Sequence, residues 1–478
     1  MKRSRKRESW LPRRSDSIFG ASAPTPCVCM GQGPALATSL CHPERSEGSR
    51  RLRCLGRSQA LATLFLLLFA AAHVSAGASS AASGAMGAAT ALHGRLMTER
   101  YLLAAPMAKL YAIYGCLAVA AGLALAAPRR RAGLLGGLAL GVAFVPVGLA
   151  IAAPIPPGHD ALYLAASFAV AIILSLLGAA AGRAVPARGL ALGMLLGAAV
   201  LVSDILAGSP LMRFSALEMG IMMGSRFYGI GNEYMGALVG MTVIGLGAWL
   251  QLSPRSGKII ALVGAFIALV IGAPFWGANW GGSATAAVGL ISLWLLSSAG
   301  DRKGSPLRKA WASRAGVAAL ALAASVIVPA ALDLLNAPSN RSHIGTAAAA
   351  LLSGDTAGLS EIISRKAGIA LRVVRTAPWS IIGAVLCAFV FWLQLRSGAP
   401  ARRALQGQRA LAAGIAAAVS AGAIAMLVND SGPAAGMGAI FAGLGSVVYL
   451  SSVGLSAAER ATTCEGPSER GLIASIKS

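Results

Sequence analysis

Apolar runs long enough to cross a lipid bilayer recur along this chain, separated by short polar or basic connections. A transmembrane helix needs about 20 consecutive, mostly apolar residues, and runs near that length are frequent here. They lie near 104–127, 132–153, 161–182, 189–207, 231–251, 259–277, 283–300, 315–334, 378–395, 410–428 and 434–454. The pattern predicts an all-α fold: a polytopic transmembrane helical bundle of about 11–12 spans, with the apolar segment at 60–76 as the twelfth.

The N-terminal part of the chain differs from this bundle in composition. Residues 1–57 are basic, rich in Ser, Pro and Arg, and lack apolar periodicity, so we interpret them as disordered or as lying upstream of the true translation start. Residues 58–77 are either a cleaved signal peptide or the first transmembrane helix, because basic residues precede the apolar run and Val-Ser-Ala follows it. Residues 78–103 would be an outer linker rich in Gly, Ala and Ser, 104–456 the bundle, and 457–478 a cytoplasmic tail.

Basic residues fall on alternate connections between the runs, which indicates the orientation of the helices. Cytoplasmic loops of membrane proteins carry an excess of Lys and Arg. The basic connections carry Arg129, Arg130, Arg131, Arg183, Arg188, Arg255, Lys258, Arg302, Lys303, Arg308, Lys309, Arg314, Arg396, Arg402, Arg403 and Arg409. The short connections between them, 154–160, 278–282 and 429–433, have no Lys or Arg. We therefore predict a multi-pass protein of the bacterial inner (plasma) membrane, with the connections that lack Lys and Arg on the outside.

The composition supports a membrane protein and argues against two other classes. The chain is 56% hydrophobic and 12% charged, with mean hydropathy +0.69, which is too apolar for an ordinary soluble protein. The net charge of +24 suggests nucleic-acid binding, but the basic residues lie in short clusters between apolar runs, so we predict no nucleic-acid partner. Four of the seven cysteines lie in residues 1–57, at spacings unlike those of common zinc modules, so we predict no metal site.

Two of the predicted outer connections are long. The first, 208–230, carries Arg213 and Glu218. The second, 335–377, contains apolar residues at helical spacing between Leu359 and Val374, with arginines on the other faces. That pattern predicts either an amphipathic helix lying on the outer leaflet or an ordinary surface helix docked on the bundle.

Four polar clusters lie at the predicted outer ends of spans. Ionisable and amide groups are expensive in a membrane and usually belong to a site or a pair. The clusters are Arg226, Tyr228, Asn232 and Glu233 with Asp204; Gly277-Ala-Asn-Trp-Gly-Gly282, which contains Asn279; Asp333 with Ser339-Asn-Arg-Ser-His-Ile-Gly345; and Asn429-Asp-Ser-Gly-Pro433. Because all four fall on the same predicted side, we expect them to form one outward-facing polar site.

Each cluster also has a purely structural interpretation. Asn232 and Glu233 would start a helix as its cap and first-turn acid. The segment 277–282 is either a tight turn or a broken helix that lines a cavity. Asn429-Asp430-Ser431 would cap the last helix, with Pro433 in its first turn. Asp204 and Asp333 would reach toward the membrane surface.

As a site, the clusters provide candidates for acid–base chemistry and for anion binding. Histidine is the usual general acid–base group near neutral pH, and arginine binds phosphate oxygens through its planar fork. The candidate catalytic residues are His343, Glu233 and Asp430; the candidate substrate-binding residues are Arg226, Tyr228, Asn232, Asn279, Arg341, Arg365 and Asn429. Standard nucleotide-binding, zinc-protease and serine-hydrolase motifs are missing, and the sequence leaves any cofactor and the oligomeric state open.

Four motifs carry a resemblance. Arg226-Phe-Tyr-Gly-Ile-Gly-Asn-Glu233, Ser342-His-Ile-Gly345, Ile363-Ser-Arg-Lys366 with Trp379-Ser380, and Asn429-Asp-Ser-Gly432 together resemble a family of uncharacterised bacterial polytopic membrane proteins, over roughly 190–455. That resemblance implies a shared fold and no particular activity. The second long loop, with Arg341 and His343, is similar in architecture to O-antigen ligases, in which a periplasmic loop with Arg and His handles undecaprenyl-pyrophosphate-linked sugars.

Three functions fit these observations. The first is an outer-leaflet enzyme that acts on a lipid-linked phosphate or saccharide in cell-envelope synthesis, with the bilayer and a lipid-linked or anionic small substrate as partners. The second is a secondary transporter or lipid flippase, which requires a polar path to about the bilayer midplane. The third is a non-catalytic scaffold, which predicts that the four clusters stay apart.

Overall fold

The computed structural model describes the chain from Ala132 to Cys464 with several gaps. The gaps are 157, 219–228, 299–306, 336–342, 356, 359, 362–363, 365–367, 369–377 and 430, and before Ala132 only Gly94, Gly115, Ala118 and Ala121 are described. The chain divides into residues 1–60 and 61–478, and all described residues belong to the second unit. The predictions for 1–57, 58–77 and 78–103, most of the span at 104–127 and the tail after Cys464 lie outside the described residues.

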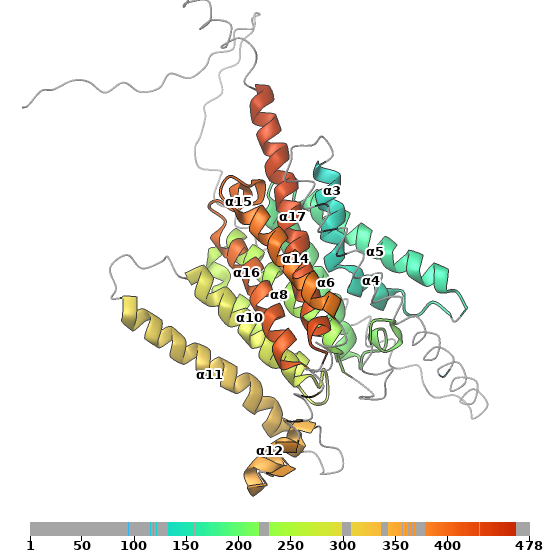
Figure 1. Cartoon of the computed structure of the whole chain (residues 1–478), viewed down its shortest axis with the longest axis vertical. Helices are drawn as coiled ribbons and strands as arrows, with labels where there is room; N and C mark the ends of the chain where they lie inside the picture. Colours follow the sequence, from blue (N-terminus) through green and yellow to red (C-terminus); the bar gives the residue numbers. More distant parts are fainter. Residues whose placement is uncertain are drawn as a thin grey trace, which may run out of the picture. The chain divides into compact units, whose positions relative to one another are not determined.

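The described residues form helices and no strands, as the apolar runs predict (Figure 1). Within the described residues, eight helical segments are long and apolar enough to cross a membrane. They belong to α5 (Asp160–Ala181), α6 (Pro186–Leu206), α8 (Asn232–Leu252), η3 with α9 (Pro254–Ser256 and Gly257–Gly272), α10 (Trp280–Ser298), α11 (Leu307–Leu334), α16 (Arg409–Val428) and α17 (Pro433–Cys464). The all-α, multi-pass prediction is therefore confirmed for this part of the chain.

The run predicted at 132–153 is a pair of short helices with a sharp bend between them. It consists of α3 (Ala132–Leu140), η1 (Gly141–Ala143) and α4 (Val145–Ile151), with a bend of 59° between its two halves. Pro146 lies in the first turn of α4. Because proline has no N–H to donate to the preceding turn and its ring crowds that turn, the helix cannot continue straight through this point.

Helix α8 lies in the centre of the bundle and is packed on all sides. Every residue from Tyr234 to Ala248 is buried, and α6, α10, α16 and α17 all contact the helix (Figure 1). Small residues make this packing possible: a Cβ atom on Gly240 would lie 2.6 Å from the Cα of Ala439 on α17. Close approach through glycine and alanine is the usual way that membrane helices associate.

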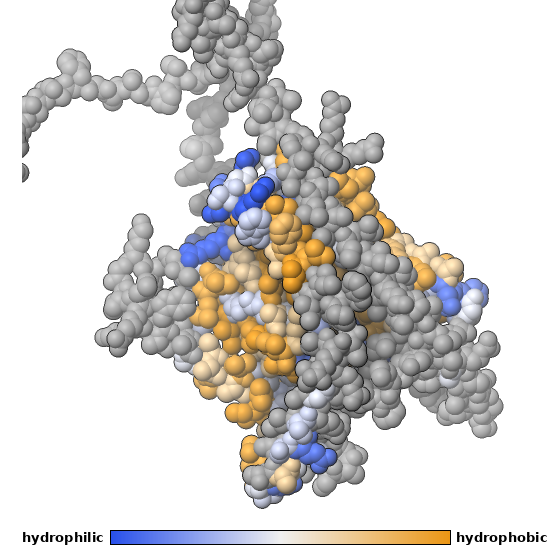
Figure 2. Space-filling view, viewed as in Figure 1, coloured by the Kyte–Doolittle hydropathy of each residue, from blue (hydrophilic) through white to orange (hydrophobic). Residues whose placement is uncertain are grey.

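The sides of the helices are apolar where they face outward. Leu262 on α9 and Leu320 on α11 are each 71% exposed, and Figure 2 shows hydrophobic surface over the helices with hydrophilic residues gathered near α15 (Pro400–Ala404). Large exposed apolar surfaces are rare on soluble monomers. Lipid contact explains them here.

The predicted span at 378–395 corresponds to α14 (Pro378–Leu395). In the second long connection the structure has a helix that the sequence pattern did not single out, α12 (His343–Ser353). The amphipathic helix predicted between Leu359 and Val374 lies mostly outside the described residues and stays a prediction.

Candidate functional site

Three of the four polar clusters meet at one end of the bundle. Asn279 Nδ2 donates to Asn232 Oδ1 at 3.0 Å, and Asn232 Nδ2 donates to Ser431 Oγ at 2.9 Å. Asn429, two residues before Ser431, is at the C-terminal end of α16 and is 5% exposed. We call Asn232, Asn279, Asn429 and Ser431 the amide cluster, and the end of the bundle that contains it the amide end.

Asn279 is the centre of the amide cluster. It is 3% exposed, and its second Nδ2–H donates to the Ile230 carbonyl at 3.1 Å while its Oδ1 accepts from Gly282 N–H at 2.8 Å. Both N–H groups and the carbonyl oxygen are therefore used within the protein. Asn279 holds the start of α10 against the start of α8, a role that serves the architecture of the site rather than direct contact with a ligand.

The segment that carries Asn279 is a tight turn between α9 and α10. Gly277 N–H donates to the Val270 carbonyl and Asn279 N–H to the Ile271 carbonyl, each at 2.9 Å. A Cβ on Gly277 would lie 2.4 Å from the Ile271 carbonyl oxygen, so only glycine fits. Of the two interpretations of 277–282, the geometry matches the turn.

The glycine-rich segment before α8 packs its backbone directly against this turn. Ile230 N–H donates to the Gly277 carbonyl at 2.9 Å, and Ser209 Oγ donates to the Gly229 carbonyl at 2.8 Å. Gly229 has φ +95°, and a Cβ there would lie 2.3 Å from the Gly277 carbonyl oxygen. Both the left-handed backbone and the close approach require glycine.

A buried carboxylate that the motifs did not reveal lies at the start of α8. Glu218 is fully buried, and its Oε2 accepts from Gly231 N–H at 2.7 Å. Gly231 is the N-cap of α8, and a Cβ on it would lie 2.3 Å from Glu218 Oε1. A negative charge at a helix N-terminus is stabilised by the helix dipole. The available signal was that a carboxylate in so apolar a chain is expensive and needs a partner.

One capping prediction at this end is wrong in detail. The N-cap of α8 is Gly231 rather than Asn232, whose side chain instead crosses to Asn279 and Ser431, although Glu233 is the first-turn acid as predicted. Asn429 Nδ2 donates to the Ala425 carbonyl at 3.1 Å and to Thr285 Oγ1 at 3.5 Å, while the cap predicted for 429–431 at α17 includes Asp430, outside the described residues, and stays a prediction. Both amides bond between helices because the neighbouring chain segments lie within reach.

The aspartates at the ends of α6 and α11 are anchored within the protein rather than directed to the membrane surface. Asp204 is 4% exposed and accepts from Leu211 N–H and Met212 N–H, each at 2.8 Å, so it organises the start of the first long connection. Asp333 is 1% exposed and accepts from Gly345 N–H at 2.9 Å. Gly345 lies in the first turn of α12, so Asp333 ties this helix to the end of α11.

Several predicted site residues cannot be compared with this geometry. Arg226, Tyr228, Arg341, Arg365 and Asp430 lie outside the described residues. His343 is the first residue of α12, and its side chain is not described. Glu233 is half-buried in the first turn of α8, beside Asn232. The structure therefore brings Asn232, Asn279 and Asn429 together, and leaves convergence of the ionisable candidates as a prediction.

The chemical character of the amide end is set by three helix N-termini. Helices α8, α10 and α17 begin at Asn232, Trp280 and Pro433, and the contacts of the amide cluster join the three starts. Each N-terminus carries a partial positive charge of about half an elementary charge, which attracts anions. Side-chain oxygens already accept at two of them: Glu218 Oε2 from Gly231 N–H at α8, and Asn279 Oδ1 from Gly282 N–H at α10. Within the described part of the chain, no group of three His, Cys, Asp or Glu residues is arranged to hold a metal ion.

Comparison of the chain with models of protein families, with curated proteins and with solved structures found no match in any of the three.

Proposed function

We propose that the chain is a bacterial inner-membrane enzyme of the cell envelope that binds the phosphate of a lipid-linked substrate, a phosphate or saccharide carrier, at its amide end. The observation that carries this proposal is the convergence of the N-termini of α8, α10 and α17 on the amide cluster. Three helix N-termini held together by side-chain amides form a rigid base that attracts an anionic group, although Glu218 already accepts from Gly231 N–H at the start of α8.

The proposal assigns the reacting groups to residues next to this base. Asp430 lies in the sequence between Asn429 and Ser431, and Glu233 follows Asn232. We propose that His343 or Glu233 acts as the general base, with Asp430 as a further acid–base candidate, and that Arg226, Arg341 and Arg365 bind phosphate oxygens. The amides of Asn232, Asn279 and Asn429 hold the helix ends in register for this chemistry.

Dense packing below the amide end supports an enzyme more than a transporter. A transporter needs a polar path to about the bilayer midplane. On α8, Gly236 packs against the Ala435 carbonyl and Gly240 against Ala439, and every residue from Tyr234 to Ala248 is buried. This packing leaves little room for a path along the central helix. The meeting of three clusters in turn favours a site over a scaffold in which they stay apart.

The test is transfer from a lipid carrier in membranes that contain the chain. Membranes would be supplied with polyprenyl-phosphate-linked sugar labelled in the sugar, and release or transfer of the label would be followed. His343→Ala should lower turnover by about 100-fold or more, the usual contribution of a general acid–base group. Arg341→Ala should chiefly raise the substrate concentration needed for half-maximal rate.

Matched controls lie on the same chain. His159→Ala replaces an exposed histidine in another connection predicted to be outside, and Arg255→Ala replaces an exposed arginine on the predicted inner side. Both should leave turnover within about twofold of wild type. Wild-type turnover of His343→Ala, at normal protein levels in the membrane, would contradict the proposed role of this loop.

A further inference from the structure

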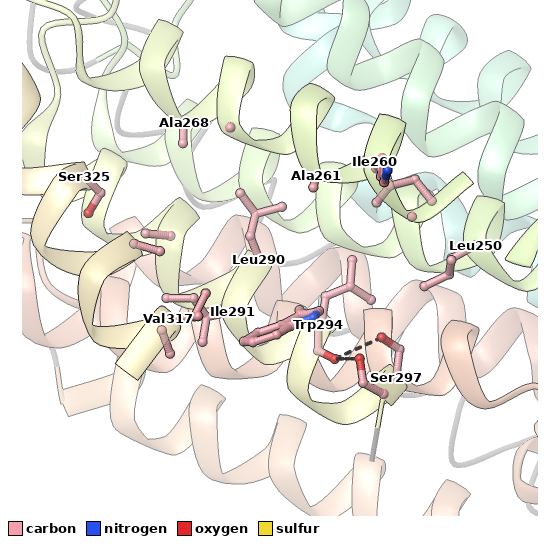
Figure 3. A pocket seen from close by; sticks show the side chains of 18 of the residues that line it. Leu250, Ile260, Ala261, Ala268, Leu290, Ile291, Trp294, Ser297, Val317 and Ser325 are labelled. Carbon is pink, nitrogen blue, oxygen red and sulfur yellow. Dashed lines mark hydrogen bonds between the residues drawn. The ribbon is translucent and has the colours of Figure 1, made fainter. Parts of the chain in front are cut away.

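A cavity of about 990 Å³ lies between α9, α10 and α11 and extends along α10 from Ser283 to Ser298. Figure 3 shows its walls: Ile260, Ala261 and Ala268 come from α9, Leu290, Ile291 and Trp294 from α10, and Val317 and Ser325 from α11. Its volume is at the upper end of the range for small-molecule sites, about 300–1,000 Å³. The cavity is therefore large enough for a sizeable ligand.

The cavity exists because α11 turns small residues toward its neighbours. Ala318, Ala321, Ala324 and Ser325 line it at helical spacing, whereas the larger Leu320 and Ile327 of α11 are 71% and 62% exposed. At one end α11 does reach the bundle, since a Cβ on Gly272 would lie 3.1 Å from Pro329 Cγ. Beyond that contact the alanines leave the space unfilled.

The serine hydroxyls in the cavity wall already donate to backbone carbonyls. Ser297 Oγ and Ser298 Oγ both donate to the Trp294 carbonyl, at 3.2 and 2.6 Å, and Ser325 Oγ donates to the Leu322 carbonyl at 2.7 Å. A cavity whose hydroxyls are bonded to backbone carbonyls offers water few partners and suits hydrocarbon. The interior thus favours an apolar chain as its occupant.

One end of the cavity is basic. Lys258 of α9 and Arg409 of α16 line this end, and the cavity lining in the described residues includes no Asp or Glu. At this end Gln251 joins the end of α8 to the start of α16. Its Oε1 accepts from Ala410 N–H at 3.0 Å, and its Nε2 donates to the Gly407 carbonyl at 3.3 Å. We call this the basic end. It is the predicted cytoplasmic side, where anionic lipids attract Lys and Arg.

We infer that this cavity binds an anionic phospholipid of the cytoplasmic leaflet, with its phosphate at Lys258 and Arg409 and an acyl chain between α11 and the α9–α10 pair. Along α10 the lining extends from Ser283 to Ser298, about 22 Å of helix. That length exceeds one leaflet, about 15 Å, and so accommodates an acyl chain that starts at the inner surface. The basic end lies at the opposite end of α10 from the amide cluster, and the inference does not depend on the chemistry proposed there.

The experiment measures which lipid the full chain retains. Protein would be purified in mild detergent, titrated with phosphatidylglycerol or phosphatidylethanolamine, and examined by native mass spectrometry. Phosphatidylglycerol should bind more tightly, and Lys258→Gln with Arg409→Gln should weaken it about 25-fold, because each basic side chain near an anionic headgroup contributes about fivefold. The control, Arg402→Gln with Arg403→Gln, removes two exposed arginines of α15 outside the cavity and should change binding less than about twofold.

A second pair of variants tests the hydrocarbon part of the site. Ala321→Phe fills the cavity and should abolish retention of either lipid, whereas Leu320→Phe on the exposed side of α11 should not. If Ala321→Phe fails to fold, the variant Lys258→Gln with Arg409→Gln tests the inference, because both of these side chains are exposed. Equal retention of both lipids by wild type, or unchanged retention by the double Gln variant, would overturn the inference. Displacement of lipid by a second copy of the chain would also overturn it.

Discussion

At the scale of single residues, the start of α8 depends on a glycine, Gly229, that no residue with a side chain can replace. Gly229 combines φ +95° with a carbonyl, that of Gly277, lying 2.3 Å from where a Cβ would be. Its own carbonyl and the N–H of Ile230 bond to Ser209 and to the 273–279 turn. Displacing this residue would separate the two segments that the amide cluster joins.

We therefore predict that Gly229→Ala destabilises the protein more than Gly158→Ala does. Gly158 has a similar φ, +81°, but no atom within 4 Å of its Cβ position, so both variants share a backbone cost of about 1–2 kcal/mol. The clash with Gly277 adds about 1–3 kcal/mol to Gly229→Ala alone. Thermal unfolding of both purified variants in the same detergent measures this difference, and equal melting temperatures would contradict it.

The residue scale also shows what the sequence could reveal of the site. Asn232, Asn279 and Asn429 were predictable because amides stand out at the ends of apolar runs, where they need partners. Which partners they take, and hence their structural role, was not predictable, because those bonds join residues far apart in the chain: Asn232 and Ser431 are 199 positions apart. Glu218 was named in the first long connection but not proposed as a site residue, since only the folded chain brings it to Gly231.

At the scale of helices, α8 and α17 depend on small residues to reach their observed separation. Gly240→Ala would gain up to about 1 kcal/mol of helix propensity, but its Cβ would lie 2.6 Å from the Cα of Ala439, which is backbone and cannot rotate away. We predict a net destabilisation of about 1–3 kcal/mol as the two helices are pushed apart.

The matched control for this prediction is Gly316→Ala on α11, where no atom lies within 4 Å of the new Cβ. It should be neutral or stabilising by up to about 1 kcal/mol, because only the propensity gain remains. Unfolding of both variants in detergent gives the comparison. A stabilising effect of Gly240→Ala would show that the contact between α8 and α17 is looser than the structure has it.

Helices were the most predictable part of the fold, because each span must present a long apolar surface whatever its neighbours are. The bend at 144–146 was less visible, although Pro146 was a signal for it. Helix α12 was missed because its segment, His343–Ser353, is short, and its anchoring comes from Asp333, which lies across a gap in the described chain. Local pattern predicts elements; their ends and bends depend on contacts between elements.

At the scale of the whole described unit, the two ends of the bundle differ in chemistry. The amide end gathers buried amides and helix N-termini, while Lys258 and Arg409 line the cavity at the other end, with Gln251 joining α8 to α16 between them. Loop charge predicts that the basic end faces the cytoplasm. Both proposals depend on this orientation: an outer-leaflet substrate requires the amide end to be outside, and the lipid inference requires the basic end to be inside.

Reporter insertions decide the orientation. Alkaline phosphatase is active only outside the cytoplasm and green fluorescent protein fluoresces only when folded inside it, so paired insertions report sidedness independently. Insertions at Gly158 and Gly354 should give phosphatase activity, and insertions at Gly398 and Gly407 should give fluorescence; all four glycines have positive φ and no atom within 4 Å of a Cβ, which favours tolerance of inserted chain. Basic residues near Gly398 and Gly407 should hold those connections inside. Fluorescence from Gly354 would place the loop that contains His343 in the cytoplasm, and the proposed outer-leaflet chemistry would then be wrong.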